Sequence, residues 1–140
     1  MKTIPYFYFN GNAAEALEFY TKIFKAESPH VMLFKDMPGA DLSSPFADKI
    51  LHAGITLDSD VYYVSDAVGK NEVTIGNNLQ INLNFDSEGE LRRIFTGLSE
   101  NGTITMPLED TFWGAVFGSL TDQFGISWTL NFQKSVADNS

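Results

Sequence analysis

The chain has 140 residues, of which 44% are hydrophobic, 14% aromatic and 19% charged, the composition of a globular protein and not of a disordered or fibrous one. A formal net charge of −9 without any cluster of Lys or Arg argues against nucleic acid and anionic membranes as partners. The absence of cysteine excludes disulfides and thiolate chemistry. No apolar run reaches the ~20 residues of a membrane span, and no signal peptide is evident, so we expect a cytoplasmic protein.

The first half of the chain predicts a strand, a helix and three further strands. Residues 3–9 are rich in aromatics and predict a strand that Asn10-Gly11 ends. Asn12 and Glu15 have the spacing of a capping box and open an amphipathic helix of about three turns. Further strands are predicted at 30–34, 50–57 and 61–65, with a long loop at 35–48 and a turn at 58–60.

The same order of elements begins again after a polar joint at 66–78. Residues 79–85 alternate as a strand, and Ser87 with Glu90 opens a second amphipathic helix. Asn101-Gly102 ends this helix. Further strands are predicted at 103–106, 113–121 and 126–132, followed by a frayed polar tail at 133–140.

Two β-α-β-β-β blocks therefore account for the chain. We expect a single domain over 1–140, with module one at about 1–66 and module two at about 77–132. One internal anchor supports the repeat, because Phe9-Asn10 leads into the first helix as Phe85-Asp86 leads into the second.

Several motifs resemble one protein family over nearly the whole chain. They are PYFYFNGN at 5–12, ALEFY at 16–20, GNN at 76–78, MPLEDTFWG at 106–114 and TDQFGISW at 121–128. These stretches resemble the PhnB-like family of the vicinal-oxygen-chelate (glyoxalase/bleomycin resistance protein/dioxygenase) superfamily, whose members often carry a 3-demethylubiquinone methyltransferase label. The resemblance implies an α+β fold in which two βαβββ modules form a curled mixed sheet around a cleft, usually in a homodimer.

The resemblance also implies where a metal would bind. Metal-dependent members of the superfamily place His or Glu at four cleft-facing positions, which match Pro5, Tyr63, Gln80 and Thr129 in this sequence. A divalent transition metal prefers imidazole, carboxylate or thiolate donors. None of the four residues supplies such a donor, so we expect no metal at these positions and no bound cofactor.

Strand alternation predicts the face that would bind a ligand. Gln80, Asn82 and Thr129 lie opposite the apolar residues of their strands. In the implied fold this polar face is the wall of the cleft, and in the alternative it is solvated surface. The remaining candidates are aromatic and either line the pocket or belong to the hydrophobic core. They are Phe7, Phe9, Trp113 and Phe117, while the matched position Tyr63 is expected to line the same cleft.

Two residues are candidates for acid–base catalysis. Alternation places His52 with Gly54 and Thr56 on the cleft face, and histidine titrates near neutral pH. Glu109 lies next to Asp110, and paired carboxylates can act as acid and base when their environments differ. The alternatives are a hydrogen-bonded or partly exposed strand histidine and two solvated carboxylates.

Three functions are compatible with these features. The first is a domain that binds a small, partly apolar organic ligand, with no assigned activity. The second is a metal-dependent lyase, isomerase or dioxygenase whose displaced site combines His52 with Glu109 or Asp110. The third is a ligand-sequestering protein of the antibiotic-resistance type. The sequence has no nucleophilic serine motif, P-loop or dinucleotide fingerprint.

Overall fold

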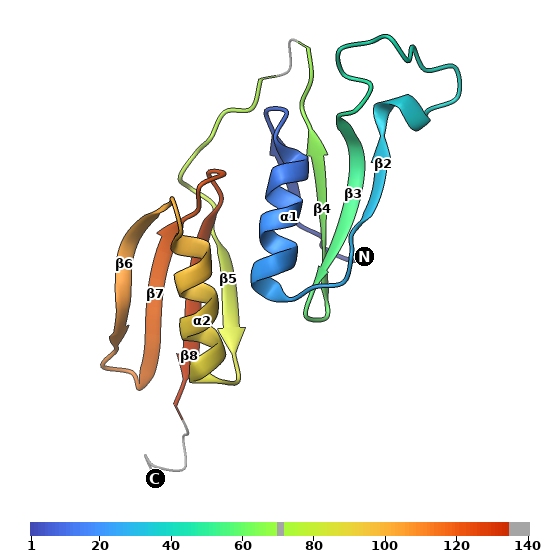
Figure 1. The fold of residues 1–140 in the computed structure, drawn as a ribbon. Helices are drawn as coiled ribbons and strands as arrows, with labels where there is room; N and C mark the ends of the chain where they lie inside the picture. The colour runs from blue at the N-terminus through green and yellow to red at the C-terminus, as the bar shows by residue number, and fades with distance from the viewer. Residues whose placement is uncertain (70–71, 135–140) are drawn as a thin grey trace. The chain divides into compact units, whose positions relative to one another are not determined.

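The computed structural model describes residues 1–69 and 72–134. The chain divides into two compact units, Met1–Thr74 and Ile75–Ser140. Each unit has the element order β-α-β-β-β and contains one helix that packs on one four-stranded mixed sheet (Figure 1). This confirms the expected α+β fold. In the part of the chain described, no helix is long and apolar enough to cross a membrane.

The sheet of the first unit has the strand order β1-β4-β3-β2. Strand β1 (Tyr6–Phe9) runs parallel to β4 (Asp60–Asp66), and β3 (Ile50–Leu57) runs antiparallel to β4 and to β2 (His30–Leu33). Residues 58–59 form the two-residue turn between β3 and β4, in which Asp58 takes a left-handed φ of 60°. The aspartate fits this position because Asp and Asn tolerate left-handed backbone better than most residues.

Helix α1 (Ala13–Phe24) covers one face of this sheet. Its apolar stripe follows the helical spacing and buries Ala13, Ala16, Leu17 and Tyr20. The short 3-10 helix η1 (Phe34–Asp36) begins the long connection to β3, which otherwise consists of turns.

The start of α1 is stabilised by a residue from the far end of the unit. The expected capping box is wrong in its first member, because the Asn12 side chain makes no capping hydrogen bond. Instead, the buried carboxylate of Asp66 accepts hydrogen bonds from the backbone N–H groups of Ala13 and Ile50, each at 2.9 Å. A carboxylate at a helix N-terminus satisfies an otherwise unpaired N–H and complements the helix dipole.

The second unit repeats this arrangement with the strand order β5-β8-β7-β6. Strand β5 (Ile81–Phe85) runs parallel to β8 (Ser127–Gln133), and β7 (Ala115–Thr121) runs antiparallel to β8 and to β6 (Thr103–Asp110). Helix α2 (Glu88–Ser99) begins where the Ser87 hydroxyl accepts a hydrogen bond from the Glu90 N–H at 3.2 Å. The equal strand orders of the two units match the expected repeat.

Several boundaries in the second unit differ from the sequence prediction. Strand β7 begins at Ala115, two residues later than expected, so Trp113 precedes the strand, and β8 begins one residue later, at Ser127. Strand β5 begins at Ile81, two residues later than expected, so Gln80 precedes the strand. Strand β6 continues to Asp110, because a register shift between Met106 and Glu109 accommodates Pro107 within it. Gln133 belongs to β8 and not to a frayed tail. Residues 135–140 of the expected tail, like 70–71 of the joint, lie outside the described residues.

Candidate functional site

Each sheet has one face that its own helix covers and an opposite face, which we call the open face. In β1 the side chains of Phe7 and Phe9 are buried on the helix side, whereas Tyr6 and Tyr8 are 38% and 53% exposed on the open face. In β3, Ala53 and its alternating apolar neighbours are buried on the helix side. His52 therefore lies on the open face, as strand alternation predicted.

Four rings contact one another on the open face of the first unit. The Tyr6 Oη lies 2.8 Å from Nδ1 of His52, within hydrogen-bond distance. The ring of Tyr63 meets His52 at a centroid distance of 4.7 Å and Tyr6 at 5.6 Å, both edge to face. Tyr8 stacks on Tyr6 at 4.8 Å. We call these four residues the tyrosine–histidine cluster.

The strand register explains why these rings meet. Tyr6 pairs with Tyr63 across β1 and β4, and Tyr63 pairs with Gly54 across β4 and β3. Directly opposed residues point to the same face of a sheet, so the ring of Tyr63 lies beside a position without a side chain. A Cβ at Gly54 would lie 3.8 Å from that ring, at ordinary van der Waals distance. Gly54 therefore adds no side chain to this part of the open face, although a methyl group would fit there.

The tyrosine–histidine cluster combines apolar ring surface with polar tips. Phenols donate and accept hydrogen bonds, and an imidazole does both through its two nitrogens. Because Tyr6 engages Nδ1 of His52, Nε2 is the nitrogen left to meet a ligand. Such an arrangement suits a flat or partly apolar molecule that carries a hydrogen-bonding group.

The open face of the second unit is polar and hydrogen-bonded along its length. The Thr129 hydroxyl donates to the Asn82 amide oxygen at 2.8 Å, and the Asn82 amide nitrogen donates to Asn84 at 3.0 Å. Asn131 also donates to Asn84, at 3.4 Å. The alternate residue Trp128 of the same strand is fully buried on the helix side. The predicted faces of Asn82 and Thr129 agree with these positions.

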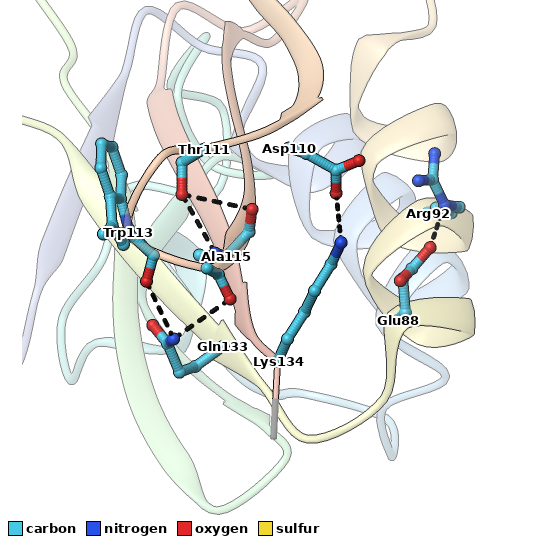
Figure 2. A network of polar contacts seen from close by, with 9 residues as sticks. Glu88, Arg92, Asp110, Thr111, Trp113, Ala115, Gln133 and Lys134 are labelled. Carbon is cyan, nitrogen blue, oxygen red and sulfur yellow. Dashed lines mark hydrogen bonds and ion pairs between the residues drawn. The ribbon is translucent and has the colours of Figure 1, made fainter. Parts of the chain in front are cut away.

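A fixed turn carries Trp113 at one end of this open face (Figure 2). The Thr111 hydroxyl accepts a hydrogen bond from the Ala115 N–H at 3.0 Å. The Gln133 side chain donates to the carbonyl oxygens of Trp113 and Gly114, at 3.4 and 3.1 Å. The indole ring is half exposed and meets the ring of Phe117 edge to face, at a centroid distance of 6.4 Å.

Glu109 and Asp110 point to opposite faces of the second sheet. Glu109 pairs with Phe117, on the open face, and Asp110 pairs with Val116, on the helix side. Lys134 donates to the Asp110 carboxylate at 2.6 Å (Figure 2). This hydrogen bond and the charge of Lys134 hold the pKa of Asp110 below its ordinary value. The two neighbouring carboxylates therefore face different surroundings, and among the described residues only Asp110 has an ion pair.

Other candidate residues lie away from the positions that the sequence suggested. Phe7 and Phe9 belong to the core under α1, where Phe7 contacts Tyr20 and Tyr62. Both side chains point to the helix side of the sheet, so they belong to the hydrophobic core and do not line the open face. Gln80 is exposed ahead of β5. The sequence prediction missed Tyr6 and Tyr8, because β1 alternates only between aromatic residues and the pattern alone could not tell its two faces apart.

The four positions matched to the superfamily's metal ligands offer weak donors. Pro5 precedes β1, and its carbonyl oxygen accepts the backbone hydrogen bond of Tyr63 at 2.9 Å. On the open faces, Tyr63 is paired across the strands with Tyr6, and Thr129 is paired with Asn82. Phenol, amide and hydroxyl groups do not fit a divalent transition metal. The residues described contain no group of three His, Asp or Glu side chains that could hold an ion.

Comparisons with known proteins agree with this architecture. The family model described as 3-demethylubiquinone-9 3-methyltransferase matches residues 1–131. A crystal structure of protein PA1353 from Pseudomonas aeruginosa is 35% identical, with a TM-score of 0.83, over 95% of this chain and 98% of that one. A putative 3-demethylubiquinone-9 3-methyltransferase, PhnB protein, from Bacillus cereus is 26% identical, with a TM-score of 0.76, over 94% and 99%.

The fold extends to more distant proteins. A glyoxalase/bleomycin resistance protein/dioxygenase family enzyme from Burkholderia phytofirmans has a TM-score of 0.59 at 12% identity, over 91% of this chain and 94% of that one. At this identity the similarity concerns the fold alone. The chain therefore belongs to the 3-demethylubiquinone-9 3-methyltransferase family, as a PhnB-like domain with the fold of the glyoxalase/bleomycin resistance protein/dioxygenase superfamily.

Proposed function

We propose that this PhnB-like domain binds a small, partly apolar organic ligand on the open face of its sheets. The observation that carries the proposal is the tyrosine–histidine cluster, in which Tyr6 and Tyr63 contact His52 and Tyr8 stacks on Tyr6. Aromatic side chains that remain exposed on a rigid strand are available for a ligand without the entropy cost of ordering them. Three tyrosines beside one histidine give flat apolar surface and several hydrogen-bonding groups within one region.

We further propose that binding needs no metal at the positions that superfamily members use. Tyr63 and Thr129 carry hydroxyl groups, and their register partners Tyr6 and Asn82 add a phenol and an amide. These groups are weaker ligands for a transition metal than the imidazole and carboxylate donors that give useful affinity. The ligand would therefore contact the side chains directly.

Proton transfer by His52 is a second candidate function. The hydrogen bond to Tyr6 at Nδ1 supports it, because that bond orients the ring and leaves Nε2 for a substrate. An enzyme of this kind would require His52, whereas a binding protein would tolerate its replacement by a residue that keeps the contact surface. Glu109 lies in the other unit and has its own surroundings.

The experiment is a screen for ligand-induced thermal stabilisation, followed by matched variants. A ligand that binds the folded protein raises its melting temperature with concentration. Tyr6→Phe removes the hydroxyl that meets His52, and the control Tyr62→Phe removes a tyrosine hydroxyl from the buried, helix-covered side of the same sheet. We expect Tyr6→Phe to weaken the affinity of a stabilising ligand about tenfold, or about 1.4 kcal/mol, and Tyr62→Phe to change the affinity little. Equal effects of the two variants would contradict the proposal.

A further inference from the structure

The four strands of the second sheet contain only two charged residues, Glu109 and Asp110, and no basic one. Asp110 lies on the helix side and is paired with Lys134. On α2, Glu88 and Glu90 are paired with Arg92 and Arg93. Glu109 has no ion pair among the described residues. The open face of this unit therefore carries one carboxylate without a compensating cation.

This carboxylate lies across from Phe117, whose ring in turn contacts that of Trp113. Glu109 is directly opposite Phe117, and Phe117 is opposite Asn131 on the next strand. Directly opposed side chains have Cβ atoms about 5 Å apart. The ring of Trp113 contacts Phe117. A cation is attracted both by a carboxylate and by the faces of aromatic rings, most strongly by that of tryptophan, so the three side chains favour the same kind of ligand.

The backbone of the turn that carries Trp113 is held by hydrogen bonds. Its carbonyl oxygen and that of Gly114 accept hydrogen bonds from the Gln133 side chain (Figure 2). The backbone N–H of Lys134 donates to Gly114 as well, at 3.0 Å. These bonds hold the backbone of the turn, so the exposed indole projects from a segment whose backbone is ordered before a ligand binds.

The nearby polar groups favour a ligand that donates hydrogen bonds. The Gln133 nitrogen is engaged with the two carbonyl groups of the turn, and the Asn131 nitrogen donates to Asn84. The side-chain oxygens of Gln133 and Asn131 are then the atoms available to a ligand, and both are acceptors. With the Glu109 carboxylate, this end of the open face presents acceptors and aromatic surface.

We infer that Glu109, Trp113 and Phe117 form a binding site for a small organic cation, a primary amine or guanidine with an apolar body. The inference rests on the proposed function, in which the open face binds ligands, and it specifies that the ligand of this unit carries a positive charge. It concerns side chains of the second unit alone. Its outcome can therefore be separated from that of the tyrosine–histidine cluster, which belongs to the first unit.

The test uses benzylammonium and its neutral counterpart benzyl alcohol, which share a ring and a similar shape. The chain has two tryptophans, so an NMR spectrum of the full-length protein contains two indole N–H signals. Trp128 is fully buried and donates to Asp122, whereas Trp113 is half exposed. We expect benzylammonium to shift the Trp113 signal saturably and benzyl alcohol to bind at least about tenfold more weakly, a difference of about 1.4 kcal/mol.

Two variants test whether the Glu109 carboxylate causes the preference for benzylammonium over benzyl alcohol. Glu109→Gln should weaken benzylammonium binding about tenfold and leave benzyl alcohol unchanged. Asp110→Asn removes the neighbouring carboxylate, which faces the other side of the sheet, and should leave benzylammonium binding unchanged. Equal binding of the two probes, no shift of the Trp113 signal, or equal losses in both variants would overturn the cation site. None of these outcomes would alter the Tyr6→Phe and Tyr62→Phe comparison, which tests the proposed function separately.

Discussion

The phenol of Tyr6 lies 2.8 Å from the imidazole of His52, although strand β4 runs between the strands that carry them. The two rings meet beside Tyr63, whose ring contacts both of them, and Gly54, next to Tyr63 on the same face, adds no side chain there. This relationship joins β1 and the hairpin of β3 and β4 into one aromatic surface. It is the basis of the proposed ligand binding.

Purified protein should contain no stoichiometric transition metal. The side chains at the matched positions are phenol, amide and hydroxyl groups, which bind zinc, nickel, iron or manganese weakly. Elemental analysis of protein prepared without chelator measures the metal content directly. A value near one ion per chain would contradict the prediction and favour a displaced site that includes His52.

We expect a homodimer in solution. Two edge strands expose large apolar side chains, Val31 and Met32 on β2 and Ile104 and Met106 on β6, each 39–49% exposed. Apolar surface on edge strands favours association with another protein surface. Sedimentation at micromolar concentration should give about twice the chain mass of 15.6 kDa. A single species at the mass of one chain would refute it.

Trp128→Ala should destabilise the protein by about 3–5 kcal/mol, as expected when a large aromatic residue is removed from a packed core. The indole is fully buried, and its N–H donates to the buried Asp122 at 2.9 Å, so the substitution also leaves a carboxylate without that partner. Gln80→Ala is the control, because Gln80 is exposed ahead of β5 and should change stability by less than about 0.5 kcal/mol. Chemical denaturation measures both. An unchanged midpoint for Trp128→Ala would show that the faces of β8 are assigned backwards.

The sequence predicted best those features that depend on neighbours along the chain. Strand β3 has the predicted bounds, because its apolar residues alternate clearly, and α1 has the predicted length. The cap of α1 could not be predicted. The carboxylate of Asp66 accepts a hydrogen bond from the N–H of Ala13, and the two residues are 53 positions apart in the sequence. The role of Asp66 depends on the parallel pairing of β1 with β4, which local patterns do not specify.

The candidate site was predicted in part for a similar reason. The alternation of β3 and β8 was sufficient to place His52 and Thr129 on the open faces. Tyr6 was missed because β1 is aromatic on both sides, so hydrophobicity does not distinguish its faces. The separation of Glu109 from Asp110 depends on the register after the shift in β6, which only the three-dimensional pairing reveals.

Lys134→Ala should raise the pKa of Asp110 toward its ordinary value of 3.8. The folded-state pKa is depressed, so the contribution of the pair to stability is present above that ordinary value and is lost as the pH falls through the folded-state pKa. Both side chains are exposed, so the effect on stability should be small. A carboxyl NMR titration measures the pKa, with Lys35→Ala as the control because Lys35 pairs with Asp48. If Asp110 titrated at the same pH in both variants, Lys134 would not be the cause of its lowered pKa.

The most direct test of the central claim follows the ring of His52 while a stabilising ligand is added. The chain has two histidines, so a His52→Gln variant identifies the His52 signals in a carbon–proton NMR spectrum. If the ligand binds the tyrosine–histidine cluster, the His52 signals should shift saturably, with the same affinity that thermal stabilisation gives, and the buried Trp128 indole signal should shift little. A ligand that stabilises the protein fully while the His52 signals stay in place would show that it binds elsewhere and would contradict the account.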